Sequence, residues 1–333
     1  MPASLSQPYR AAREAAALLT PSRGLLVVSG RDRASYLQGL LTNDVSALTA
    51  GQGCYAAYLT AQGRMISDLH VYELGDVLLL TLPPQTTAAV LAKLDQFIFS
   101  EDVQLGDVSA TFAAIDVLGP DASRVIATAT GIGPVELDAL PPNGNLRSQV
   151  LGQPVILLRV DDTGVNGFEL LAPPDLLPAL LAALRGAGST DLDPASAEAL
   201  RIEAGVPRFG ADMDEETIPL EAGIESQAIS FTKGCYVGQE IIIRVLHRGH
   251  GRVARKLVGL AFAPEAAVPA VGTTLHGADR DLGVVTSSAM SPSLGHPVAL
   301  GYVKRDAAEP GTVVTTADGV AATVVALPFA PPA

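Results

Sequence analysis

The feature that most constrains this 333-residue chain is a change in its apolar runs near residue 255. Beyond that point the runs are short, rich in valine and separated by glycine and proline, with almost no helical spacing. Such segments are typical of strands joined by tight turns. They are residues 257–262, 282–287, 298–303 and 313–325. We therefore expect a small β-barrel over residues 251–333.

The first 250 residues instead mix strand-like and helix-like segments in irregular order. Residues 54–59 and 65–72 read as two strands joined by a hairpin at Thr60-Ala61-Gln62-Gly63. Helical spacing follows over residues 86–97, and Pro194 is compatible with the first turn of another helix. Hairpins among helices favour an α+β fold over a doubly wound parallel sheet. We place the division between the two parts at residues 250 and 251.

Composition and charge exclude several classes of protein. Hydrophobic residues make up 48% of the chain and charged residues 17%, which excludes general disorder. The formal net charge of −13 argues against non-specific nucleic-acid binding, because phosphates would be repelled. The apolar runs are shorter than the roughly 20 residues that span a bilayer, and the N-terminal region lacks a secretion-signal pattern. We therefore expect a cytoplasmic protein with no membrane or direct nucleic-acid partner.

The segment with the most specific chemistry is Lys233-Gly234-Cys235-Tyr236-Val237-Gly238-Gln239-Glu240. Lys233 and the later Arg244 place Cys235 in an electropositive loop, an environment that lowers the pKa of a thiol and favours the reactive thiolate. The alternative is that Cys235 is a small buried hydrophobic residue, the commoner fate of a lone cysteine. Cys54 is the one other cysteine, so the chain cannot supply the four thiolates of a conventional iron–sulfur cluster.

This segment and several others resemble the YgfZ-type folate-binding proteins of the glycine-cleavage T-protein superfamily. The other matching segments are Gly30-Arg31-Asp32, residues 36–45, Gln62-Gly63-Arg64 with Asp68, Arg201-Ile202-Glu203-Ala204-Gly205 and residues 219–223. The resemblance implies a T-protein-like α+β module, in which residues 1–250 form two interleaved subdomains around a central cavity. It also implies tetrahydrofolate as the cofactor. The implied role is accessory: assembly or repair of iron–sulfur enzymes, including tRNA-modifying ones, with iron–sulfur client or assembly proteins as partners.

The resemblance also implies roles for individual residues. Cys235 would be the working thiol, with its reactivity tuned by Lys233. Glu203 corresponds to the superfamily glutamate that holds the pterin ring, since a carboxylate can accept two adjacent N–H groups. The alternative for Glu203 is a surface acid paired with Arg201 or Arg208.

Four further residues complete the expected folate-binding set. Tyr236 is one of the aromatic residues able to stack on the pterin. Arg244 begins a basic segment, residues 244–256, that would receive the carboxylates of the folate tail or of a partner. The alternative, favoured for any single arginine there, is a solvated face of a helix over residues 239–248. Arg201 and Gln239 are the other two expected ligands.

The chain departs from the superfamily's transferases in residues 82–90. The resemblance implies a catalytic aspartate in this stretch, which here contains no acid. Aminomethyl transfer would lose its expected catalyst, although Asp68 and Asp102 lie nearby in sequence and could replace it. We therefore favour the accessory role, and a folate-dependent aminomethyltransferase or demethylase is the alternative. Whether the chain is an enzyme stays open at this point.

Overall fold

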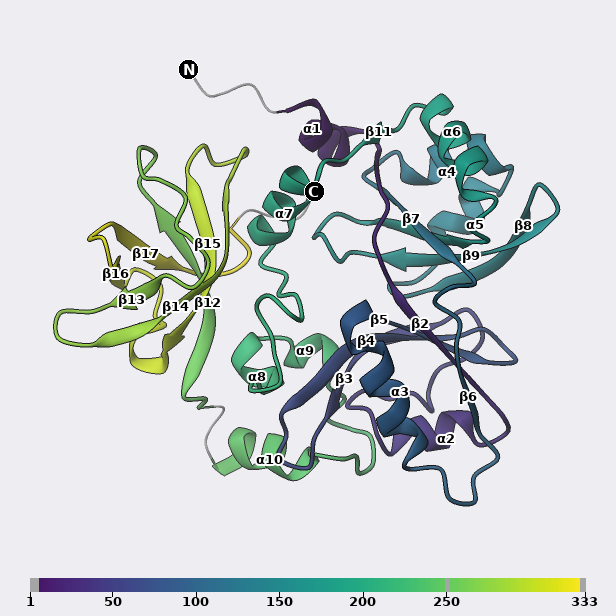
Figure 1. Cartoon of the computed structure of the whole chain (residues 1–333), viewed down its shortest axis with the longest axis horizontal. Helices are drawn as coiled ribbons and strands as arrows, with labels where there is room; N and C mark the ends of the chain where they lie inside the picture. The colour runs from purple at the N-terminus through teal and green to yellow at the C-terminus, as the bar shows by residue number, and fades with distance from the viewer. Residues whose placement is uncertain (1–5, 249–251, 330–333) are drawn as a thin grey trace.

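The computed structural model describes residues 6–248 and 252–329, which form two α+β parts and a closed barrel (Figure 1). The expected α+β class with a C-terminal barrel is thus confirmed. The predicted division at residues 250 and 251 lies outside the described residues and stays a prediction. The expected barrel run at 313–325 is two strands, and the expected helix at 239–248 is a short α-helix followed by a π-helical turn.

The first sheet has five strands in the order β3-β4-β5-β2-β6, all paired antiparallel. Its strands are β2 (Gly24–Ser29), β3 (Gly53–Leu59), β4 (Met65–Glu73), β5 (Leu78–Leu82) and β6 (Gln104–Asp107). Helices α2 (Arg33–Gln38) and α3 (Thr87–Asp95) contribute to the core on one face, where Leu37 and Val90 pack with Leu80 of the sheet. A short 3-10 turn, η1 (Pro84–Thr86), leads into α3.

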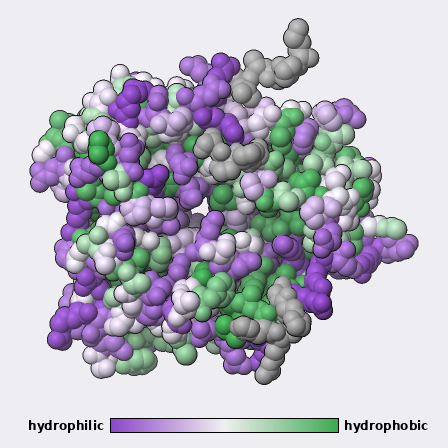
Figure 2. Space-filling view, turned by 180° about the vertical axis from the view of Figure 1, so that it is seen from behind, coloured by the Kyte–Doolittle hydropathy of each residue, from purple (hydrophilic) through white to green (hydrophobic). Residues whose placement is uncertain are grey.

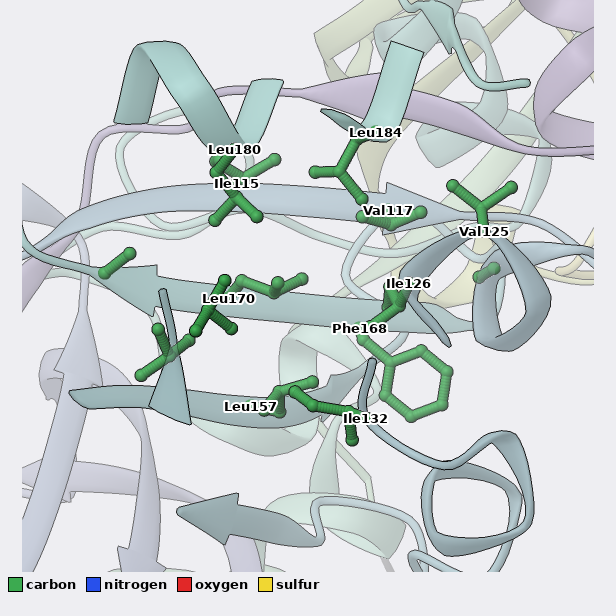
Figure 3. Packing of buried hydrophobic residues seen from close by; sticks show 14 of the residues in the cluster. Ile115, Val117, Val125, Ile126, Ile132, Leu157, Phe168, Leu170, Leu180 and Leu184 are labelled. Carbon is green, nitrogen blue, oxygen red and sulfur yellow. The ribbon is translucent and has the colours of Figure 1, made fainter. Parts of the chain in front are cut away.

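The second sheet has six strands in the order β11-β1-β7-β10-β9-β8. Its strands are β1 (Ala17–Leu19), β7 (Ala113–Leu118), β8 (Asn145–Val150), β9 (Gln153–Val160), β10 (Gly167–Ala172) and β11 (Thr190–Asp191). Three helices cover one face: α4 (Ala122–Thr130), α5 (Pro134–Asp138) and α6 (Leu177–Gly186). Figure 3 shows this core, in which Ile126 and Leu184 of the helices pack with Ile115, Phe168 and Leu170 of the strands.

The two sheets share a third hydrophobic core. Leu25 and Leu79 of the first sheet belong to the same buried cluster as Leu158 and Leu171 of the second. Tyr9 of helix α1 (Gln7–Glu14) is also part of it. Such a shared interior fixes the relative position of the two sheets because it is packed at the density of a crystal.

The segment between the second sheet and the barrel begins with α7 (Pro194–Glu203), where the Asp193 side chain accepts a hydrogen bond from the Ser196 N–H. Short helices follow: α8 (Pro219–Ala222), α9 (Glu225–Ala228), α10 (Gln239–Ile243) and the π-helical turn η2 (Arg244–Arg248). Apolar residues from this region pack against β3 and β4 of the first sheet, through Leu59 and Met65.

The barrel closes in the strand order β12-β15-β14-β13-β16-β17. Its strands are β12 (Arg255–Phe262), β13 (Thr274–His276), β14 (Asp281–Met290), β15 (Pro297–Lys304), β16 (Val313–Thr316) and β17 (Ala321–Val325), with the turn η3 (Arg305–Ala307) between β15 and β16. Ile202 of α7 packs with Leu257 and Leu300 of the barrel, so α7 anchors the barrel to the rest of the chain.

The surface mixes polar and apolar residues. Seen from behind, hydrophilic and hydrophobic residues are interspersed over most of the molecule (Figure 2). Within residues 6–248 and 252–329, no helix is both long and apolar enough to cross a bilayer.

Candidate functional site

A cavity of about 850 Å³ lies between the first sheet, the second sheet and the segment that follows α7. This volume falls within the range of sites that bind small molecules and cofactors. Its walls combine prolines and apolar residues with a set of polar side chains that includes Tyr55, Asp68, His70, Gln85, Asp161 and Asp162. The cavity predicted at the centre of the fold is therefore present.

Strand β4 supplies the central part of this polar wall. Residues two apart on a strand share a face, so Asp68 and His70 point to the same side. In the antiparallel register with β3, Tyr55 is opposite His70, and their ring centroids are 5.0 Å apart. Ser67 and Leu69 alternate with these residues and are buried on the other face. The hairpin of β3 and β4 thus places a carboxylate, an imidazole and a phenol together.

Asp68 is held by one of its two carboxylate oxygens. Tyr55 Oη donates a hydrogen bond of 2.9 Å to Asp68 Oδ2. The other oxygen, Oδ1, is buried and has no hydrogen-bond partner in the described part of the chain. Burial raises the pKa of Asp68, and the Tyr55 hydrogen bond and the nearby charge of His70 offset part of that effect. A buried, unpaired carboxylate oxygen with a raised pKa in a cavity is a feature of functional sites.

Arg23, another residue of the cavity lining, forms ion pairs with two acids. Its guanidinium donates to Asp162 and to Glu169, each at 2.6 Å. Burial on its own would raise the pKa of Asp162, but the charge of Arg23 and the hydrogen bond of His70 outweigh it, and the pKa is lowered. Burial and the charge of Glu169 raise the pKa of the adjacent Asp116 well above its usual value. Arg23 therefore keeps Asp162 ionised at the cavity wall.

Comparison with known proteins places the chain in a family. Residues 1–233 match the GCVT N-terminal domain, and residues 255–330 match the glycine cleavage T-protein C-terminal barrel domain. The chain belongs to the glycine cleavage T-protein family.

Individual relatives cover nearly the whole chain. An aminomethyltransferase of Saccharopolyspora erythraea is 34% identical over 330 residues, which is 96% of this chain and 88% of that protein. An aminomethyltransferase of Rubrobacter xylanophilus is 32% identical over 328 residues, covering 98% and 86% of the two chains. The crystal structure of glycine cleavage system aminomethyltransferase T from Bartonella henselae superposes with a TM-score of 0.88 at 26% identity, covering 98% of this chain and 89% of that one.

These relatives confirm the superfamily and overturn the function favoured from sequence. At 31–34% identity they are named aminomethyltransferase, which contradicts the iron–sulfur accessory role and leaves the expected iron–sulfur partners without support. The inference had rested on the absence of an acid in residues 82–90. The T-protein cavity has Asp68 in its wall instead, supplied by β4. Tetrahydrofolate, the expected cofactor, agrees with membership of this family.

The sequence left Asp68 and Asp102 as possible replacements for the missing aspartate, and the structure places them in different surroundings. Asp68 lines the cavity, whereas Asp102 has 45% of its side chain exposed and pairs with Arg31 at 2.7 Å. Tyr55, His70 and Asp162 are cavity residues that the sequence did not identify. A signal was present for His70, because the polar residues at positions 68 and 70 share one face of a predicted strand.

Glu203 lies outside this T-protein cavity, among the residues that join α1, α7 and the barrel. It is 1% exposed, and its carboxylate accepts hydrogen bonds of 2.5 Å from Tyr9 Oη and from Ser291 Oγ. Burial and this hydrogen bond raise the pKa of Tyr9 to about 12, so the phenol stays a donor. Neither Glu203 nor Cys235 is among the described residues that line the cavity.

Arg201 does line the cavity, but its guanidinium is committed to other partners. It donates to Glu198 and Asp212, at 2.6 and 2.7 Å, and to Ser287 of the barrel at 2.7 Å. The backbone carbonyl of Val206 accepts a further hydrogen bond. Arg201 therefore joins α7 to the barrel at the edge of the cavity.

Within the motif at residues 233–240, Lys233 holds the end of α2 and the segment that follows it. Lys233 Nζ donates to the backbone carbonyls of Gln38, Leu41 and Asn43 at 2.7, 2.7 and 2.8 Å. These three bonds use all the donors of the ammonium. Its charge also lies 5.2 Å from the ring centre of Tyr236, which is buried.

Cys235, two residues after Lys233, is exposed. Gly238 has a φ of +85°, and a side chain there would meet the Thr60 carbonyl oxygen at 2.6 Å. The glycine therefore permits close packing of α10 on the β3–β4 hairpin. Gln239 begins α10, and Arg244 pairs with Glu240 at 2.6 Å on the surface. Residues 249–251 of the predicted basic segment lie outside the described residues.

Proposed function

We propose that this chain is a folate-dependent aminomethyltransferase that binds tetrahydrofolate in the cavity and uses Asp68 as its catalytic carboxylate. One observation carries the proposal: Asp68 is a half-buried acid, with one buried and unpaired oxygen, in the wall of a ligand-sized cavity. Family membership supports the reaction class, and the match extends over most of each relative's length.

The residues of the cavity fit a folate. A pterin is a flat polar heterocycle with N–H donors, and the Asp68 carboxylate in the cavity wall is an acceptor for such a donor. Gln85 provides an amide on the same lining, and Tyr55 provides an aromatic ring. The volume of about 850 Å³ leaves room for the rest of the ligand.

Tetrahydrofolate, when bound, supplies the amine that receives the one-carbon unit. Asp68 accepts the proton that this amine must lose. Its negative charge also stabilises the positive charge that develops beside it. Burial raises the pKa of Asp68, which makes it a stronger base than an exposed aspartate. Tyr55 orients the carboxylate through the hydrogen bond to Oδ2.

The test is the rate at which methylenetetrahydrofolate forms from an aminomethyl donor in the wild type and in Asp68→Asn. We expect the substitution to lower kcat by about 10²- to 10⁴-fold, the usual contribution of a positioned acid or base. Asp102→Asn is the matched control because that aspartate is on the surface, and its rate should equal that of the wild type.

Two results would contradict the proposal. Absence of turnover by the folded wild type would remove the enzymatic function. Turnover by Asp68→Asn within about threefold of the wild type would remove Asp68 from the chemistry, since such a change is worth less than 1 kcal/mol.

A further inference from the structure

His70 is a partly buried imidazole beside the proposed catalytic acid. Its side chain is 16% exposed, and it lines the cavity next to Asp68 on the same face of β4. Nε2 lies 3.5 Å from Asp162 Oδ1, and Nδ1 lies 3.0 Å from Asn143 Oδ1. Both ring nitrogens therefore meet oxygen acceptors.

This arrangement selects the protonated ring. Neutral imidazole has one donor nitrogen and one acceptor nitrogen, whereas imidazolium has two donors. Two oxygen acceptors on opposite sides of the ring match the second form. Burial alone would lower the pKa of His70, but the hydrogen bond and charge of Asp162 outweigh it, and the pKa is raised.

The charge balance around the ring favours the same state. The charge of Arg23 lowers the pKa of His70, while Asp162 raises it. Arg23 also keeps Asp162 ionised, so the negative charge beside the ring persists. Tyr55 lies against one side of the ring and Tyr72 is stacked at 6.0 Å. The titratable and charged groups that face or act on His70 are Asp68, Asp161, Asp162, Arg23, Tyr55 and Tyr72.

We infer that His70 is a positioning residue, a fixed imidazolium held by Asp162 and Asn143 that keeps Asp68 ionised in the cavity. This role rests on the proposed function of Asp68. A positive charge beside a buried carboxylate favours its ionised form, which is the form that can accept a proton. The Tyr55 hydrogen bond and the charge of His70 together offset part of the cost of burying this carboxylate.

The kinetic test compares the dependence of kcat on pH in the wild type, His70→Gln and His70→Arg. Loss of the cation in His70→Gln should raise the pKa of Asp68 and move the acid limb up by about one pH unit. His70→Arg restores a positive charge and should return the limb toward the wild-type position. His276→Gln is the matched control, because this histidine is on barrel strand β13, and its profile should be unchanged.

A second measurement does not depend on turnover. The titration of His70 is followed by NMR in the wild type without ligand and in Asp68→Asn. We expect a midpoint above the usual value of about 6.5 in the wild type. The midpoint should be lower by about one pH unit in Asp68→Asn, because coupling between two sites is reciprocal.

The outcomes separate the two proposals. Wild-type protein without turnover counts against the proposed function, while the NMR titration still decides the state of His70. A wild-type midpoint at or below 6.5, or one that Asp68→Asn leaves unchanged, overturns this inference even if the enzyme is active. An active His70→Gln whose acid limb coincides with that of the wild type overturns it as well.

Discussion

Tyr55 donates a 2.9 Å hydrogen bond to one oxygen of Asp68 across strands β3 and β4, and the other oxygen of that carboxylate has no partner among the described residues. The bond fixes the orientation of the acid in the cavity wall. The hairpin register creates this pair, because Tyr55 is opposite His70 and Ala57 is opposite Asp68.

Replacement of Tyr55 by Phe removes this hydrogen bond and keeps the ring. The bond lowers the pKa of Asp68, so its loss should raise that pKa and move the acid limb of the kcat profile to higher pH. The free energy of unfolding should fall by about 1 kcal/mol, the usual worth of such a bond. Urea unfolding and the pH–rate profile measure the two effects, and Tyr58→Phe is the matched control. An unshifted acid limb would show that the bond does not act on Asp68.

Replacement of Lys233 by Met should destabilise the first sheet. Three backbone carbonyls lose their charged donor, and a hydrogen bond to a charged group contributes more than a neutral one. We expect a loss of about 2–3 kcal/mol in the free energy of unfolding. Lys93→Met, on the exposed face of α3, should change it by less than about 0.5 kcal/mol. Equal stability of the two variants would mean that the carbonyls find other donors.

Replacement of Glu203 by Ala separates a structural role from a ligand role. Tyr9 and Ser291 would lose their buried acceptor, so the free energy of unfolding should fall by about 2–4 kcal/mol. Affinity for tetrahydrofolate, measured by calorimetric titration at a temperature where the variant is folded, should stay within about twofold of the wild type. A tenfold loss of affinity would instead assign Glu203 to the folate site, as the sequence resemblance implies.

Acid titration should reveal the ion pair of Arg23 and Asp162. The pKa of Asp162 is lowered from its usual value of 3.8 in the folded protein. Its contribution to stability is therefore present above that value and is lost as pH falls below it through the folded pKa. Denaturant unfolding between about pH 5 and pH 2 should show a shallower loss of stability in Asp162→Asn than in the wild type. Parallel curves for the two proteins would refute the lowered pKa.

Much of the fold follows from local patterns. The hairpin at residues 60–63, the helix that begins after Asp193 and the valine-rich barrel strands were all predictable, because alternation, capping and turn residues act over a few positions. Helix α1 and the short strands β1 and β11 were not predicted. They are stabilised by contacts with distant segments, such as the register of Ala17 with Thr190 and with Leu118.

Some features of the candidate site likewise follow from the sequence, and others depend on the tertiary structure. The sequence by itself determined the T-protein superfamily, the tetrahydrofolate expectation and a pair of acids, Asp68 and Asp102, that could serve catalysis. The tertiary structure alone decided that Asp68 lines the cavity and that Glu203 meets Tyr9, a residue 194 positions away. The physical reason is that burial and partnership depend on strand register and on packing between the two sheets and the barrel. Those relationships join segments that no local pattern in the chain connects.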